Sequence, residues 1–301
     1  MRTHSAPSGR VHGTAACLRN LHRTTARARW DAVRVVSRLF DSPSAWHCCG
    51  MVQRNLEPPP DLAPPAWVGS WLGRREDLIV RHGFTSDQLL LTWWNDHLAA
   101  AGMTDHQVRL HSREGGTPGL TRGDLFGMAS SLDESSSDDD YLTLLWHVLA
   151  WGSGTSRRNN VKRIAAFTDP TAREERVGLL RAATAAARQG DTATAYGTLI
   201  RRGGGAIPDL GPAFFTKFLY FVGGGKPEHA CLILDARVAT TLHAAGWWTI
   251  PAGSYNWYTQ TYVAYCSLLA EWARAATVAA GQPIAPDEFE RALFAGRPLD
   301  N

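Results

Sequence analysis

Apolar and polar residues follow one another along most of the chain with the period of an α-helix. Apolar residues recur three and four positions apart, and almost nothing alternates with the period of two that strands would require. We therefore expect a mainly α fold, and we find no internal repeat. The pattern and its start and stop signals predict helices over 86–101, 121–132, 141–151, 156–167, 170–189, 191–201, 212–222, 236–245 and 255–273.

One of these helices is apolar around its whole circumference. Residues 141–151 (YLTLLWHVLAW) leave no polar face, which in a globular protein predicts a buried central helix. The acidic stretch 133–140 before it should be a solvated loop whose carboxylates favour the following helix start. Gly152, Ser153 and Gly154 should end the helix.

The first 58 residues differ in composition from the rest. Residues 1–50 carry eight arginines and two aspartates, a balance of +6, so the remainder of the chain stands at −3. Because this segment has no sustained period, we expect 1–58 to be a basic, disordered extension ending in a Pro-rich linker, followed by one folded domain over 59–301. Two alternatives stay open, an arginine-rich arm that binds phosphate and a chain that truly starts at Met51.

Composition narrows the class of protein. With 301 residues, 44% of them hydrophobic, the chain can bury a substantial core. No stretch approaches about 20 consecutive apolar residues and no secretory signal is present, so we expect no membrane segment and a cytoplasmic location. The five cysteines show no C-x-x-C pair or zinc-ligand spacing, which predicts reduced thiols, no metal and no cofactor.

Residues 203–245 carry the chemistry. Three glycines lead into 206–211 (AIPDLG), which we interpret as a hairpin, and Pro212 occupies the first turn of the next helix. Such a hairpin points backbone amides outward in front of a helix N-terminus, where a phosphate oxygen can bind. The apolar run 230–234 (ACLIL) then ends at Asp235, directly before another helix.

In this arrangement the chain resembles the helix-hairpin-helix DNA glycosylases, most closely their bacterial 8-oxoguanine DNA glycosylase-like members. The family hairpin L-P-G-V-G-P is similar to 207–212 (IPDLGP), and the family aspartate, in an apolar-apolar-x-Asp-x-x-Val setting, matches Asp235 in 232–238. Residues 144–152 and 158–160 also look like this group, and the resemblance covers 120–275. It implies two helical subdomains with a cleft between them, and excision of a damaged or modified base by cleavage of the N-glycosidic bond.

The chain departs from the family pattern at two positions. Asp209 replaces the first hairpin glycine and places an acid near the expected phosphate, so it must turn away or cap the amides. Bifunctional members have a lysine directly after the hairpin, where this chain has Ala213; Lys217 follows one helical turn, about 6 Å, further on. Its spacing of 18 residues from Asp235 occurs in some bifunctional members, so its role stays open.

The resemblance makes Asp235 the candidate catalytic carboxylate. Breaking the bond between base and sugar leaves positive charge on the sugar, which a desolvated carboxylate stabilises, or the carboxylate orients a water nucleophile. An aspartate before a helix also commonly caps that helix, and the two roles are compatible.

Lys217 is the candidate nucleophile. Its aromatic neighbours on the predicted helix 212–222 favour a neutral amine, which could form a Schiff base with the sugar and permit strand cleavage. Equally, its stem could pack on these rings while the ammonium reaches water or a carbonyl. A monofunctional enzyme that uses Asp235 and water stays possible.

An excised base must leave the helical stack and enter a pocket that sandwiches its ring. The candidates for this base pocket are Trp146, His147, Trp151, Tyr255 and Tyr258, although most of the twelve tryptophans should pack in the core. The candidates for contacts with DNA are Pro208, Leu210, Gly211, Arg157, Arg158, Asn159, Asn160 and Lys162. The last five could instead be a solvated helix start.

The expected partner is double-stranded DNA with a flipped target base, bound by a monomer in the cytoplasm, at the nucleoid of a bacterium. The substrate could be an oxidised purine in repair or a modified base of phage DNA in defence. Two other functions compete. A noncatalytic helix-hairpin-helix DNA-binding protein would need no desolvated Asp235 facing the hairpin, and an interaction protein with a decayed site would explain Asp209 and Ala213.

Overall fold

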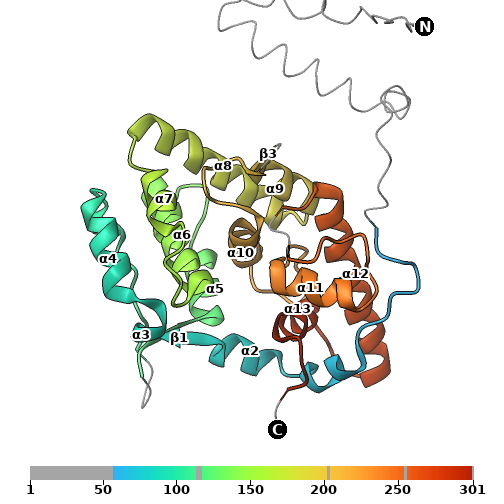
Figure 1. Cartoon of the computed structure of the whole chain (residues 1–301). Coiled ribbons are helices and arrows are strands. Elements are labelled where there is room, and N and C mark those ends of the chain that lie inside the picture. The colour runs from blue at the N-terminus through green and yellow to red at the C-terminus, as the bar shows by residue number, and fades with distance from the viewer. Residues whose placement is uncertain (1–56, 113–116, 202–203, 254–255, 300–301) are drawn as a thin grey trace, which may run out of the picture. The chain divides into compact units, whose positions relative to one another are not determined.

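The computed structural model describes residues 57–112, 117–201, 204–253 and 256–299, which belong to one compact unit, Arg54–Asn301. The described residues are mainly helical (Figure 1), as the pattern of apolar positions predicts. The expectation for residues 1–58 falls almost entirely outside them. None of the helices in these ranges is long and apolar enough to cross a membrane.

The order of the elements is as follows. The helices are the 3-10 helix η2 (Ala66–Trp71), α2 (Arg75–Arg81), α3 (Ser86–Leu89), α4 (Leu91–Ala100), the 3-10 helix η3 (Thr104–His106), α5 (Arg122–Ser130), α6 (Asp138–Ser153), α7 (Asn160–Ala165), α8 (Pro170–Arg188), α9 (Thr192–Leu199), α10 (Pro212–Val222), α11 (Ala236–Ala244), α12 (Thr259–Ala280) and α13 (Pro286–Ala295). The strands form two antiparallel pairs, β1 (Gly83–Thr85) with β2 (Gly119–Thr121) and β3 (Ile200–Arg201) with β4 (Gly204–Gly205).

Helices α6 and α10 form the centre of the core. Nearly every residue of 141–151 is buried, which confirms the predicted central helix, and α10 packs against α5, α6, α8 and α9 (Figure 1). Helix α6 begins three residues earlier than predicted, at Asp138. The reason is a capping box, in which the Asp140 carboxylate accepts from the amide of Ser137 at 2.8 Å and the amide of Asp140 donates back to the Ser137 hydroxyl at 3.3 Å.

The predicted helix 86–101 is interrupted. Leu90 adopts a left-handed conformation with φ +52°, which separates α3 from α4. In a continuous helix, residues five positions apart point about 140° away from one another. The break lets both Leu89 and Trp94 reach the core, where each is fully buried.

Among the described α-helices, α2 and α13 were absent from the prediction. Helix α2 lies early in the folded unit and α13 near the end of the chain, yet the two pack together, and α13 also packs on α11, α12 and η2. Helix α12, predicted over 255–273, begins at Thr259 and continues to Ala280. Sequence segments far apart are thus brought together beside the site described below.

Candidate active site

The segment before Asp235 is buried, but it is neither helix nor strand. Residues 231–234 are almost completely inaccessible, and a buried peptide group needs a hydrogen-bond partner. Tyr262 and Tyr265 of α12 donate hydroxyl hydrogen bonds of 2.8 and 2.7 Å to two of its carbonyls. The amide of Leu234 donates to the hydroxyl oxygen of Thr216 at 3.2 Å. These three hydroxyl groups supply the hydrogen bonds that a neighbouring strand would otherwise provide, and they hold the backbone of 231–234 in place before Asp235.

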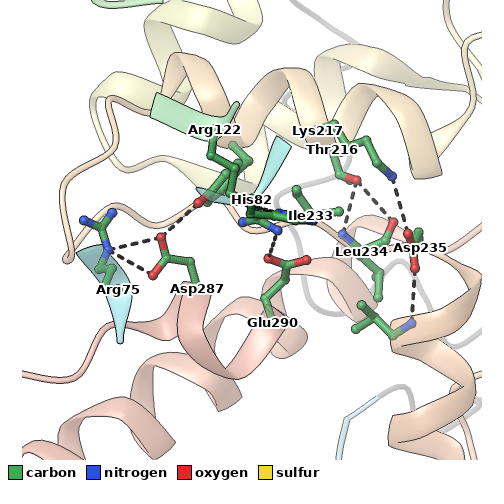
Figure 2. A network of polar contacts seen from close by, with 12 residues as sticks. Arg75, His82, Arg122, Thr216, Lys217, Ile233, Leu234, Asp235, Asp287 and Glu290 are labelled. Atoms are coloured by element: carbon green, nitrogen blue, oxygen red, sulfur yellow. Dashed lines mark hydrogen bonds and ion pairs between the residues drawn. The ribbon is translucent and has the colours of Figure 1, made fainter. Parts of the chain in front are cut away.

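Asp235 caps α11 and faces a lysine at the same time. Its Oδ1 accepts hydrogen bonds from the amides of Arg237 and Val238 at 3.0 and 3.2 Å. Its Oδ2 lies 3.4 Å from Nζ of Lys217 (Figure 2). Asp235 therefore caps α11 through one oxygen and faces Lys217 with the other.

Lys217 reaches Asp235 through a narrow gap. Its Nζ donates to the carbonyl of Ala213 at 2.7 Å, one turn earlier on α10, and lies 5.6 Å from the ring centre of Phe214. A Cβ atom on Gly152 would lie 2.7 Å from Cδ of Lys217. Gly152, expected to end the central helix, lies inside α6 and leaves room for the lysine stem.

Lys217 and Asp235 line one cavity of about 360 Å³. Its wall is partly aromatic, because the ring of Trp151 makes edge contacts with His82 at 5.2 Å and with Phe84 at 6.1 Å. The other lining residues that matter here are Arg122, Gly152 and Glu290. Elements from both ends of the folded unit thus meet at the carboxylate and the amine.

A buried charge cluster that the sequence did not reveal lies at this wall. Arg122 is almost completely buried, forms an ion pair of 2.9 Å with Glu290 and donates from Nε to Nδ1 of His82 at 2.9 Å (Figure 2). Burial raises the pKa of the Glu290 carboxyl, against the opposing effect of Arg122. Burial and the positive charges of Arg122 and Arg291 lower the pKa of His82 to about 2.

The cluster continues through α13 to α2. Nε of Arg75 donates to both carboxylate oxygens of Asp287 at 3.1 and 3.2 Å, and the hydroxyl of Tyr220 donates to the same carboxylate at 2.9 Å. These contacts join α2, α10 and α13, and Figure 2 shows the pair of Arg75 and Asp287. The sequence does contain a signal for α13, because Asp287 and Glu290 stand among apolar residues with an amphipathic helical pattern. The prediction did not include this helix.

A protein-family model described as "Putative 8-oxoguanine DNA glycosylase OGG-like protein" matches residues 79–294. The chain belongs to this family. The match extends beyond the 120–275 of the sequence resemblance and includes His82, Arg122, Lys217, Asp235 and Glu290. A search of curated proteins and a search of solved structures each found no match.

In this OGG-like protein the expected hairpin precedes α10. Pro208 is exposed, Leu210 is buried and Gly211 is the N-cap of α10. Asp209 adopts φ +59°, the left-handed region that favours the glycine found at this position in the family hairpin. Its carbonyl accepts a hydrogen bond of 2.9 Å from Nε of Arg163, a residue that sequence reasoning did not single out.

Arg163 joins α7 to the hairpin and to α10. It is buried, its guanidinium lies 3.7 Å from the ring centre of Phe214, and burial lowers its pKa to about 10. It also donates to the side-chain oxygen of Asn160. Asn160 is fully buried and its amide donates to Ser153 and Ser156, so this side chain holds the loop together and does not face solvent.

The other residues expected to contact DNA are accessible. Arg157, Arg158, Asn159 and Lys162 are exposed at the start of α7. The carbonyl of Arg158 accepts from Arg163, which also binds the hairpin. The exposed cations and the hairpin are therefore connected through one buried arginine.

Of the residues expected in a base pocket, Trp151 lines the cavity. Trp146 is fully buried and packs edge-on against Phe167. His147 lies away from the cavity lining; its Nε2 accepts from the amide of Arg109 at 2.9 Å, and burial lowers its pKa to about 4. Tyr258 is 64% exposed and does not line the cavity either, whereas Tyr255 lies outside the described residues.

Proposed function

We propose that this OGG-like protein is a DNA glycosylase that cleaves the N-glycosidic bond of a base held in the cavity, with Asp235 as the catalytic carboxylate. The observation that carries the proposal is the meeting of Asp235 and Lys217 in one cavity, 3.4 Å apart, after a buried segment fixed by tyrosine hydroxyls. Membership of the OGG-like family supports the same reaction class.

Asp235 stabilises the charge that appears on the sugar as the base departs. Its two oxygens are oriented before any substrate binds, one by the amides of α11 and one by Lys217. A charge held in place in a partly desolvated site requires little reorganisation in the transition state, which is the main source of electrostatic catalysis.

Lys217 serves as the amine nucleophile in this proposal. The amine in its neutral form adds to C1′ as the base leaves with the electron pair of the N-glycosidic bond, and one of the two N–H protons passes to the departed base. The other N–H proton then moves to O4′ as the C1′–O4′ bond breaks, which opens the sugar ring and gives a Schiff base between Nζ and C1′. The hydrogen bond to Ala213 and the contact with Asp235 hold Nζ at the cavity wall.

DNA approaches through the hairpin and the start of α7. The N-terminus of α10 offers backbone amides to a phosphate, the exposed Pro208 lies on the hairpin in front of it, and the exposed Arg157, Arg158 and Lys162 supply positive charge. A cavity of about 360 Å³ lies within the range of ligand sites that enclose a group as large as a base.

The test is base release from a panel of duplexes that each carry one oxidised purine or one modified pyrimidine. Asp235→Asn should lower the single-turnover rate about 100- to 1,000-fold, because the amide carries no charge. It should fold normally, since asparagine caps helices as well as aspartate does. The matched control is Asp169→Asn, which changes the N-cap of α8 and should retain full activity.

The panel also decides between substrates and between functions. Release of an oxidised purine would favour repair, and release of a modified pyrimidine would favour action on phage DNA. Tight duplex binding without release of any base would contradict a glycosylase and favour the noncatalytic helix-hairpin-helix DNA-binding protein.

A further inference from the structure

The sheet of β1 and β2 holds His82 beside Arg122. Gly83 pairs with Thr121, so the residues that flank this pair also meet, and the amide of Arg122 donates to the carbonyl of His82 at 3.1 Å. A Cβ atom on Gly83 would lie only 2.4 Å from the carbonyl oxygen of Leu120. Glycine at this position therefore permits the close strand approach that sets the two side chains against each other.

The contact between the two side chains fixes the protonation of the imidazole. Nε of Arg122 donates to Nδ1 of His82 at 2.9 Å. Burial, with repulsion from Arg122 and Arg291, lowers the pKa of His82 to about 2. The nearby carboxylate of Glu290 is paired with Arg122. The ring is therefore neutral at physiological pH. Because Nδ1 is the acceptor, the single ring hydrogen is on Nε2.

The ring is also held in place at the cavity wall. Trp151 contacts His82 at 5.2 Å with an interplanar angle of 79°, and Phe84 contacts it at 6.1 Å and 60°. His82 lines the same cavity as Asp235. Within the described ranges, no residue accepts a hydrogen bond from Nε2. A preoriented donor without a protein partner is typical of a ligand contact.

We propose that His82 determines substrate specificity, by donating a hydrogen bond from Nε2 to an acceptor atom of the base held in the cavity. This rests on the proposed function, because it requires a base at that place. Arg122 is a positioning residue, which keeps Nδ1 occupied and Nε2 a donor. A base edge with a carbonyl oxygen fits the donor, whereas an amino group in its place would put two donors face to face and be rejected.

The first experiment examines the imidazole without any substrate. The full chain is labelled with ¹⁵N-histidine, and the His82 signals are identified by their absence in His82→Gln. Nitrogen shifts of a neutral ring with hydrogen on Nε2 are expected throughout pH 4.5–8.5. A titration near the ordinary histidine pKa of about 6.5, or hydrogen on Nδ1, would overturn the proposal.

The role of Arg122 has its own readout. The double variant Arg122→Met, Glu290→Gln removes the ion pair without leaving one charge unpaired in the interior. The ring hydrogen of His82 should then be able to occupy Nδ1 as well as Nε2, because Nδ1 no longer accepts a hydrogen bond from Arg122. A ring that keeps its hydrogen on Nε2 alone in a folded double variant would contradict the positioning role.

The second experiment measures coupling between His82 and the base. Single-turnover release is measured on duplexes with 8-oxoguanine and with analogues that lack O6 or O8. His82→Phe keeps a ring against Trp151 and Phe84 but removes the donor, so release of 8-oxoguanine should fall about tenfold, and His82→Gln should restore part of it. On the analogue that lacks the recognised acceptor, His82→Phe should cause no further loss.

The outcomes separate this inference from the proposed function. If wild type releases 8-oxoguanine and His82→Phe lowers the rate on every analogue equally, His82 does not read the base. If wild type releases other bases but not 8-oxoguanine, recognition of this base by His82 is overturned while glycosylase activity stands. The matched control His97→Phe changes a histidine that contacts Trp93 outside the cavity, and it should leave all rates unchanged.

Discussion

Nζ of Lys217 lies 3.4 Å from Oδ2 of Asp235, although 18 residues separate the two in the chain. Both side chains are nearly buried, with 8% and 12% of their surface exposed, so the contact is largely shielded from solvent. The two carboxylate oxygens of Asp235 make different contacts, because Oδ1 caps α11 and Oδ2 faces the amine of Lys217. The first turn of α11 therefore orients Asp235, and the carbonyl of Ala213 on α10 orients Lys217. Both groups line the cavity.

Replacement of Lys217 by alanine should abolish covalent capture of DNA. If Nζ forms the Schiff base, borohydride reduction traps a complex in wild type and none in Lys217→Ala, and strand cleavage disappears with it. The control is Lys226→Ala, an exposed lysine that does not line the cavity. A trapped complex that persists without Lys217 would place the nucleophile elsewhere. A wild type that releases base but is never trapped would indicate a water-dependent enzyme.

A methyl group at Gly152 should displace the lysine without unfolding the protein. The added Cβ would lie 2.7 Å from Cδ of Lys217, which is shorter than a van der Waals contact between two carbon atoms. The flexible side chain of Lys217 is the part that can move away. We expect Gly152→Ala to lower the trapping rate about 10- to 100-fold, because a misplacement near 1 Å can cost about 100-fold, with a small change in Tm. Gly178→Ala is the matched control, because its Cβ would meet nothing within 4 Å.

The tyrosine that supports the segment before Asp235 should affect both stability and rate. Tyr265→Phe leaves the buried carbonyl of Ile233 without its 2.7 Å hydrogen bond and should cost about 1–3 kcal/mol in the free energy of unfolding. Tyr196→Phe removes a hydrogen bond of the same length to Trp257 and should cost a similar amount. Only Tyr265→Phe should also lower the rate of base release, because only its segment leads to Asp235. Equal rates in the two variants would contradict this.

The sequence predicts best where a local signal determines local structure. Helix α10 has the predicted bounds, 212–222, because proline starts it and glycine follows it, and Asp235 precedes α11 as the resemblance implied. The pairing of Arg122 with Glu290 could not be predicted in this way. The pair depends on β1, a strand of only three residues, and on the packing of α13, which lies more than 150 residues further along the chain. No local sequence pattern predicts a contact between positions so far apart.

The departure of the hairpin from its family pattern gives a further prediction. Asp209 holds a left-handed φ of +59°, which costs a non-glycine residue about 1–2 kcal/mol. Asp209→Gly should raise the free energy of unfolding by about 1 kcal/mol and, by removing an exposed carboxylate beside the proposed phosphate site, tighten binding to duplex DNA. Asp209→Ala removes the same charge but keeps the strain, so it should tighten binding without gaining stability. Weaker binding by both variants would show that the carboxylate helps to bind DNA.

The cations at the start of α7 should contact phosphates, and salt dependence measures this directly. Each phosphate contact releases condensed counterions, so log Kd for duplex DNA changes with log salt by about 0.9 per contact. Arg157→Ala and Arg158→Ala should each reduce that slope by about one and weaken binding similarly on all sequences. Arg274→Ala, an exposed arginine on α12, makes the same change in net charge and is the matched control. If all three variants changed the slope equally, the effect would come from overall charge, and the path of DNA across α7 and the hairpin would be wrong. A slope that falls only for Arg157→Ala and Arg158→Ala would place phosphates at the start of α7. Arg163 connects this segment to the hairpin through the carbonyls of Arg158 and Asp209.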